Sequence, residues 1–130
     1  MTREKKRASQ NRTVAITEAE RAHLLSNIVS IPMLEKSTPI LNKIINESFK
    51  HVLQFVSDCS INLLILDPPY NLDKVFSTTK FNKTTVGEYT AYLEDILEAW
   101  YPKLKANATV YICGDWRTSM SICNAASKFF

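Results

Sequence analysis

INLLILDPPY, residues 61–70, joins a largely apolar run to two consecutive prolines. The run Ile61–Leu66 has the length and composition of a strand buried in a sheet. Neither proline can donate a hydrogen bond to a sheet ladder, so the strand should end before Asp67. Beyond that end come a carboxylate, two backbone carbonyls and an aromatic ring. Such oxygens accept hydrogen bonds from an amino group, and a tyrosine ring stacks on a flat heterocycle. The segment therefore predicts a strand end suited to an amino-bearing ring.

A simpler interpretation of Asp67-Pro68-Pro69-Tyr70 needs no function. A Pro-Pro pair after a strand is often only a rigid turn, and an aspartate before it is often a cap or a turn acceptor. The strand context and the following Asn71 favour the functional interpretation.

Length and composition indicate one folded domain or a piece of one. The chain has 130 residues and a hydrophobic share of 45%, which is ordinary for a globular protein. No apolar run approaches the roughly 20 residues that span a bilayer. No signal-type apolar core follows the N-terminal charges. We therefore expect a soluble, cytoplasmic protein with no membrane partner.

The cysteines and histidines predict no metal site. Cys59, Cys113 and Cys123 are odd in number and lack the spacing of a zinc knuckle or a disulfide framework. We expect them to be buried, reduced thiols. His23 and His51 have no neighbours at metal-ligand spacing and are expected at the surface or on helices.

The positive charge is concentrated at the N-terminus. The chain carries +3 overall, but its first twelve residues carry +4, which leaves −1 for the rest. The charges of this segment are Arg3, Lys5, Lys6, Arg7 and Arg12 against Glu4. Such a tail is either solvated and disordered or a phosphate-contacting arm whose binding weakens with salt. The sequence leaves both interpretations open.

The N-terminal half predicts two helices before the strand at residues 61–66. Thr17 and Glu20 form a capping box for a short helix that should end before Pro32, outside the main sheet. Residues 41–46 are expected to be a short strand or a helix end. A second helix should start at Ser48 and continue to Val56.

Two further helices flank a second predicted strand. Residues 87–104 place apolar and aromatic side chains three and four apart, which predicts a long amphipathic helix that ends near Pro102 and has its aromatics in the core. Residues 109–113 predict a strand and residues 118–130 a helix. This order predicts an α/β fold with a mainly parallel sheet and flanking helices. The segments that follow the two strands should then share the edge where such sheets bind ligands.

The loop at residues 71–86 is a candidate DNA-facing segment. It carries three lysines, Lys74, Lys80 and Lys83, together with Phe76 and Phe81. Lysines can contact phosphates while an aromatic side chain props open the base stack. A solvated surface loop with two hydrophobic anchors explains the same residues.

Asp67-Pro68-Pro69-Tyr70 after an apolar strand resembles the catalytic motif of the amino-directed, S-adenosylmethionine-dependent DNA methyltransferases. The longer string DPPYNLDK, residues 67–74, resembles the adenine-specific enzymes of restriction-modification systems. The resemblance extends weakly from about Asn42 to the C-terminus. It implies a partial Rossmann-like methyltransferase domain, DNA as partner and S-adenosylmethionine as cofactor.

The resemblance also implies a role for each motif residue. Transferred by position, Asp67 and the Pro68 carbonyl hold the amino nitrogen of a flipped-out base, Pro69 fixes the turn and Tyr70 stacks on the base. Asp67 can instead bind the cationic amino group of the cofactor. Asn71, Lys74, Lys80 and Lys83 are the candidate DNA-binding residues. An exocyclic amino group is a poor nucleophile because its lone pair is delocalised, and fixed acceptors that draw its hydrogens out of plane would restore that lone pair.

A second segment, Gly114-Asp115-Trp116-Arg117, resembles one that follows the next strand in the same enzymes. Trp116 is expected to be a wall of the pocket or part of the packing, and Asp115 a helix cap. Arg117 is expected to reach either DNA or a carboxylate.

The glycines limit the resemblance. Family members carry a Phe-x-Gly-x-Gly loop whose bare backbone lets the cofactor approach, but this chain has only Gly87 and Gly114. In the permuted subclass the catalytic motif comes first and that loop lies near the C-terminus. We therefore expect residues 1–40 to be a basic flexible tail and N-terminal helix. Residues 41–130 are expected to be the catalytic-motif part of a methyltransferase domain that is incomplete at its C-terminus.

An incomplete domain predicts low activity and a partner. The S-adenosylmethionine site would be incomplete, so this chain alone should methylate DNA poorly or not at all. Its incomplete sheet should expose an apolar edge, which favours self-association or a complementing C-terminal chain.

Three functions remain open on sequence alone. The first is an adenine-specific DNA methyltransferase, with cytosine amino methylation as its near neighbour. The second is a methyltransferase that modifies ribosomal RNA or glutamine, although those enzymes usually carry the glycine-rich loop upstream of the catalytic motif. The third is a non-catalytic nucleic-acid-binding remnant that retains the motif without turnover.

Overall fold

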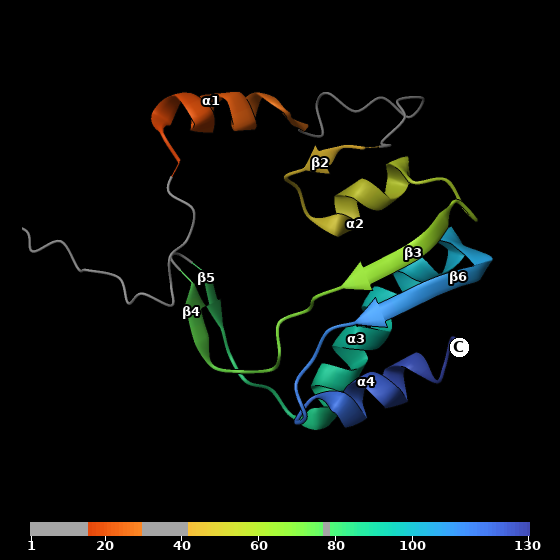
Figure 1. Cartoon of the computed structure of the whole chain (residues 1–130). Coiled ribbons are helices and arrows are strands. Elements are labelled where there is room, and N and C mark those ends of the chain that lie inside the picture. The colour runs from red at the N-terminus through yellow and green to blue at the C-terminus, as the bar shows by residue number, and fades with distance from the viewer. Residues whose placement is uncertain (1–15, 30–41, 77–78) are drawn as a thin grey trace, which may run out of the picture. The chain divides into compact units, whose positions relative to one another are not determined.

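The computed structural model describes residues 16–29, 42–76 and 79–130, except the side chains of Phe76 and Thr79. Contacts along the chain divide it into two compact units, Met1–Glu47 and Ser48–Phe130. The basic segment at the N-terminus lies outside the described residues, so both interpretations of it stay predictions (Figure 1).

The first unit contains the predicted capping box. Helix α1, Glu18–Ser26, begins after Thr17, whose Oγ1 accepts a hydrogen bond from the Glu20 N–H at 3.2 Å. The Glu20 carboxylate accepts the Thr17 N–H at 2.7 Å in return, and this bond lowers the pKa of Glu20. Two short parallel strands follow, β1, Ile28–Val29, and β2, Ile44–Ile45. The element expected at residues 41–46 is therefore a strand in its described part.

The second unit is built on two parallel strands, β3, Ile61–Leu66, and β6, Leu104–Ile112 (Figure 1). The bounds of β3 are those predicted. The bounds predicted for the other strand, residues 109–113, were wrong at its start, because Leu104 already pairs with Ile61. That early part of β6 is held by backbone hydrogen bonding rather than by an apolar pattern, so the sequence carried no signal for it.

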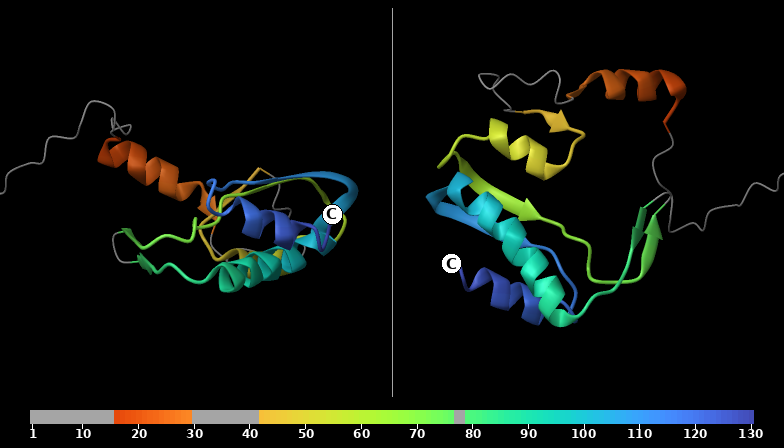
Figure 2. Two further views of the ribbon diagram at one scale, coloured as in Figure 1. Left: turned by 90° about the horizontal axis from the view of Figure 1, so that it is seen from below. Right: turned by 180° about the vertical axis from the view of Figure 1, so that it is seen from behind.

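Two helices cover one face of this strand pair (Figure 2). Helix α3, Val86–Trp100, starts at a capping box formed by Thr85 and Glu88. Helix α4, Ser119–Ala126, packs beside it. The core consists of Tyr89, Leu93, Leu97 and Ala125, packed against Leu66, Ile112, Ile122, Ala126 and Phe129. The sheet face that carries Leu66 and Ile112 is thus sealed by the helices.

Helix α3 ends at Trp100, close to the end predicted near Pro102, whereas α4 ends at Ala126, before the predicted end at Phe130. After Trp100 the chain forms a 3-10 helix, η4, Tyr101–Lys103, with Pro102 in its first turn. After α4 the chain turns, and the Phe129 and Phe130 N–H groups both bond to the Ala126 carbonyl. The predicted core position of the aromatics holds for Tyr89, which is 4% exposed, but Tyr92 and Tyr101 are exposed.

The helix predicted to run from Ser48 to Val56 is less regular than expected. It consists of α2, Phe49–Val52, followed by a 3-10 turn, η3, Leu53–Phe55. The predicted cap is absent, since the Ser48 side chain makes no capping bond to α2. The Phe49 ring stacks on Trp100 of α3, with centroids 6.2 Å apart.

Strand β3 is buried on one face only, so the prediction of a fully buried strand was wrong. Leu64 is 7% exposed beneath the helices, whereas Leu63 and Ile65 are 53% and 63% exposed. Tyr111, which pairs with Ile65, is exposed on the same face. The second unit is therefore a mixed α/β structure with helices on one side of its parallel pair.

The loop predicted at residues 71–86 contains a hairpin that the sequence analysis missed. Strands β4, Lys74–Phe76, and β5, Thr79–Phe81, pair antiparallel, with Lys74 opposite Phe81. These strands are too short to show a recognisable alternation of apolar and polar residues.

The cysteines are less buried than predicted. Cys59 and Cys123 are exposed, Cys113 is partly buried, and all three are free. In the described ranges, no cluster of acidic, histidine and cysteine side chains could hold a metal ion. His23 and His51 are exposed, as expected. Among the described residues, no helix is long and apolar enough to cross a membrane.

Candidate active site

A cleft of about 360 Å³ opens where β3 ends. Its walls are Asp67, Pro68, Pro69, Tyr70, Leu72, Lys74 and Phe81. The structure thus brings together the residues predicted as catalytic. It adds Leu72 and Phe81, and it includes one predicted DNA-binding residue, Lys74.

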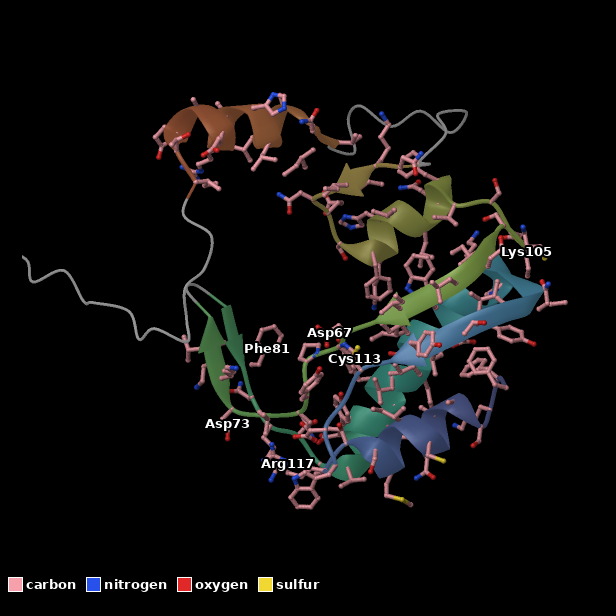
Figure 3. The ribbon with its side chains drawn as sticks, viewed as in Figure 1. Asp67, Asp73, Phe81, Lys105, Cys113 and Arg117 are labelled. Carbon is pink, nitrogen blue, oxygen red and sulfur yellow. The ribbon has the colours of Figure 1, made fainter. Side chains whose placement is uncertain are left out.

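The prolines end the strand as the sequence predicted. The last hydrogen bond beyond the β3–β6 pair runs from the Cys113 N–H to the Leu66 carbonyl, at 2.7 Å. Pro68 and Pro69 have no N–H with which to continue the ladder. Asp67 consequently leaves the sheet at the edge that also carries Cys113, while Lys105 lies at the opposite end of the strands (Figure 3).

Tyr70 is hydrogen-bonded to the carboxylate of the motif. Its hydroxyl donates to Asp67 Oδ1 at 2.9 Å. This hydrogen bond is the main cause of a raised pKa for Tyr70, with smaller contributions from burial and from the negative charge of Asp67. Within the described residues no hydrogen bond reaches the other carboxylate oxygen, Oδ2. Asp67 is exposed, so this oxygen is available to a ligand.

Tyr89 anchors the turn from behind. Its hydroxyl donates to the Pro69 carbonyl at 2.8 Å. Burial raises the pKa of Tyr89 to about 12, so the hydroxyl keeps its proton. Among the described residues, no hydrogen bond occupies the Pro68 carbonyl, the one predicted to act with Asp67. The helical pattern predicted only a core position for Tyr89. The available signal was a tyrosine rather than a phenylalanine on a buried helix face, because a buried tyrosine hydroxyl usually has a hydrogen-bond partner.

A second hollow adjoins the same turn. It has a volume of about 400 Å³ and shares Asp67, Pro68 and Pro69 with the cleft. The remaining walls are apolar or aromatic, with Phe49, Tyr92 and Trp100 as the rings. Asp67 therefore lies between an open cleft on one side and an apolar hollow on the other.

Asn71 and Asp73 bond to the chain beyond the hairpin. The Asn71 side chain accepts the Thr84 N–H at 2.7 Å and donates to the Thr84 carbonyl at 3.1 Å. Asp73 Oδ1 accepts the Lys83 N–H at 2.9 Å. Asn71, predicted to contact DNA, thus has its amide engaged within the protein.

The predicted DNA-binding lysines are separated by the hairpin. Lys74 of β4 is exposed and lines the cleft. Lys80 of β5 and Lys83 beyond it are exposed but do not line the cleft. Phe81 is half-buried, and Figure 3 shows it on the side of the hairpin that faces Asp67.

The second predicted segment forms a closed turn after β6. Asp115 accepts hydrogen bonds from the backbone of Arg117 and Thr118 and from the Arg117 guanidinium. The Arg117 bonds are the largest cause of a lowered pKa for Asp115. Of the two partners expected for Arg117, the structure shows the carboxylate. Asp115 stabilises the turn before α4 and is not the predicted helix cap, because the N-cap of α4 is Thr118.

Trp116 is not part of the packing, because it is 84% exposed, and it lines neither of the two hollows at the end of β3. It lies beneath the guanidinium of Arg117, whose Cζ is 5.9 Å from the ring centroid. Gly114 allows the turn to approach α4, since a Cβ at this position would clash with Ile122. A side chain at this position would therefore require the Ile122 side chain to move.

Comparison with known proteins gives a partial match. Over 60 residues, this chain is 40% identical to the type II methyltransferase M.HpaI of Haemophilus parainfluenzae. The match covers 46% of this chain and 19% of that protein, so it spans about a fifth of the length of its relative. No protein-family profile matches the chain. The similarity supports a methyltransferase relationship for the matched segment.

Proposed function

We propose that this chain is the catalytic segment of an S-adenosylmethionine-dependent DNA methyltransferase that modifies the exocyclic amino group of adenine. One observation carries the proposal: Asp67, Pro68 and Tyr70 line one cleft at the end of β3. The 40% identity to a type II methyltransferase supports the reaction class. The proposed setting is a restriction-modification system in the cytoplasm, on a partial Rossmann-like domain.

The acceptors of the cleft would activate the amino group. Asp67 Oδ2 and the Pro68 carbonyl would accept its two hydrogens, which draws the nitrogen lone pair out of conjugation with the base. The nitrogen then forms a bond to the methyl carbon while the bond from that carbon to sulfur breaks. One amino proton leaves to solvent or to Asp67. The prolines contribute rigidity, because a fixed turn keeps the acceptors in place.

Aromatic side chains would hold the base. The Tyr70 ring lines the cleft, and its hydroxyl is restrained by Asp67. A base removed from its stack loses contacts that an aromatic face can replace. Phe81 lines the same cleft from the hairpin and would provide a second apolar wall.

The residues present fit part of the cofactor. When bound, S-adenosylmethionine supplies an electrophilic methyl group on a sulfonium. Asp67 could pair with its ammonium group, and the rings of Tyr92 and Trp100 could pack against its adenine. Gly87 and Gly114 do not form the glycine-rich loop that the resemblance implies. We therefore propose that the rest of the cofactor site lies on a further segment.

The exposed sheet face fits such a further segment. Leu63, Ile65 and Tyr111 present apolar surface opposite the helices. The matched relative is about five times longer than the matched region. A complementing chain, or a second copy of this chain, would remove this surface from water.

A chimeric enzyme tests the proposal. The segment of M.HpaI that corresponds to the second unit of this chain is replaced by Ser48–Phe130, so that the exchanged segment carries Asp67 and Tyr70. Transfer of labelled methyl groups to DNA is measured, and digestion to nucleosides identifies the methylated base. We expect methylated adenine from the chimera and little or no transfer from the 130-residue chain alone. Asp67→Ala and Tyr70→Ala should abolish transfer, and activity that survives Asp67→Ala would refute the assigned role. Methylated cytosine would instead support cytosine amino methylation.

A further inference from the structure

The β4–β5 hairpin is fastened at its base by side chains rather than by further strand pairing. The paired strands end at Lys74 and Phe81. Just outside the paired strands, the Asp73 carboxylate accepts the Lys83 N–H, and the Asn71 side chain accepts the Thr84 N–H. Residues 72–76 and 79–83 therefore form an arm whose two ends are joined by these hydrogen bonds.

Both the oxygen and the nitrogen of the Asn71 side-chain amide form hydrogen bonds with Thr84. Its Oδ1 accepts the Thr84 N–H at 2.7 Å and the Thr84 hydroxyl at 3.1 Å. Its Nδ2 donates to the Thr84 carbonyl at 3.1 Å. An asparagine side chain in this geometry imitates the donor and acceptor of a neighbouring strand. The hydrogen bonds join positions 13 residues apart in the sequence.

The arm is fastened between two rigid neighbours. Asn71 follows Tyr70 directly, and the turn before it is held by the bond from Tyr89 to Pro69. Thr84 precedes Thr85, which caps α3 through a reciprocal pair of bonds with Glu88. Closing Asn71 onto Thr84 therefore sets the arm relative to both the cleft and α3.

The backbone at Asn71 explains the choice of residue. Its φ is 50°, in the left-handed region that asparagine and glycine adopt at the least cost. Glycine would keep this backbone but lose the side-chain bonds. Aspartate would keep an acceptor for the Thr84 N–H but could not donate to the Thr84 carbonyl. The two substitutions separate the backbone requirement from the side-chain requirement.

We propose that Asn71 is a positioning residue that latches the arm so that Phe81 and Lys74 line the base-binding cleft. Both side chains come from the arm, and both face the cleft that contains Asp67 and Tyr70. Asn71 acts through the arm and does not contact the base. The proposal rests on the proposed function for the meaning of the cleft, but the latch itself is a property of the fold.

The test uses the full chain and two measurements. Hydrogen exchange at the Thr84 amide reports the latch. Fluorescence of 2-aminopurine in a single-stranded oligonucleotide reports entry of an adenine-like base into an aromatic cleft. In Asn71→Gly we expect Thr84 exchange to rise roughly tenfold or more and the apparent Kd to rise roughly tenfold, because hydrogen bonds of modest net strength are lost. Asn71→Asp should give smaller changes in both. In both variants, the thermal midpoint of unfolding of the α3–α4 core should stay within a few degrees of the wild-type value.

Lys80→Ala is the matched control. It removes a charge from the same arm, so the affinity should fall with a shallower dependence on salt while Thr84 exchange stays unchanged. Asn71→Gly should leave the salt dependence unchanged. Unaltered Thr84 exchange in Asn71→Gly would overturn the latch. Faster exchange with unaltered 2-aminopurine affinity would overturn its positioning role. If the wild-type chain gives no fluorescence response at all, the proposed function fails, and the exchange data alone then decide the latch.

Discussion

Two turns follow the paired strands β3 and β6, and each carries an aspartate, but the two carboxylates are bound in opposite ways. Asp115 accepts the backbone N–H groups of Arg117 and Thr118, both at 3.0 Å. It also accepts the Arg117 guanidinium at 2.6 and 2.9 Å. Asp67 accepts one bond within the described residues, from the Tyr70 hydroxyl at 2.9 Å. The turn of Asp115 is therefore closed on itself, and the turn of Asp67 is open.

The difference separates a structural aspartate from one that can bind a ligand. A carboxylate offers about four acceptor positions. Asp115 fills its positions inside its own turn, so a ligand could reach it only by breaking bonds that shape the start of α4. Asp67 keeps one oxygen for a donor from outside. Position after a parallel strand is shared by both residues, and their hydrogen bonds distinguish them.

The largest expected effect comes from Asp67→Asn in the chimeric enzyme. The amide places a donor where the amino group needs an acceptor, so methyl transfer should fall by about 10²- to 10³-fold, as for other preorganised polar groups. Labelled methyl transfer to DNA measures this. Because Asp67 is exposed, urea unfolding of the variant should match that of wild type. A clear loss of stability with little loss of transfer would place Asp67 in the same structural class as Asp115.

The open turn was largely predictable because its signals are local. The apolar run Ile61–Leu66 and the two prolines define where β3 ends, and the structure reproduces those bounds. The same pattern could not show how many faces of the strand are covered. Ile65 is exposed because no described element packs over it, and that depends on the rest of the fold rather than on the run itself.

The parts of the site that escaped prediction depend on contacts between distant residues. Asn71 and Thr84 are 13 residues apart, and Tyr89 and Pro69 are 20 apart. Neither pair forms a local pattern, so a loop was expected where the structure has a hairpin. The Asp115 turn was misjudged for the opposite reason. Its bonds are local, but the sequence cannot show that Arg117 turns inward to the carboxylate while Trp116 points to solvent.

A smaller effect is expected from Asp115→Asn, and it should concern stability. The amide cannot reproduce the charge-assisted bonds to Arg117, so the urea midpoint should fall while Asp67-dependent transfer in the chimera is retained. The folded state lowers the pKa of Asp115 below 3.8, so its contribution is present above that pH and is lost as the pH falls through the lowered value. Unfolding at pH 6 and pH 3 should show the wild-type advantage shrinking in acid. An equal difference at both pH values would contradict a role for the ionised carboxylate.

The smallest effect tests whether the open turn depends on an anchor outside itself. Tyr89→Phe removes the hydroxyl that holds the Pro69 carbonyl and leaves the packing of the ring in place. The free energy of unfolding should fall by about 0.5–1.5 kcal/mol, the usual net worth of one hydrogen bond. Folding raises the Tyr89 pKa from 10.0 to about 12, so the difference should be constant near neutral pH and should shrink as the pH rises from 10 towards 12. Tyr92→Phe is the matched control on the same helix, because its ring is more exposed and no hydrogen bond of its hydroxyl is among those described. Equal losses for the two variants would mean that Pro69 needs no anchor. A loss confined to Tyr89→Phe would show that the open turn, unlike the Asp115 turn, is held by α3.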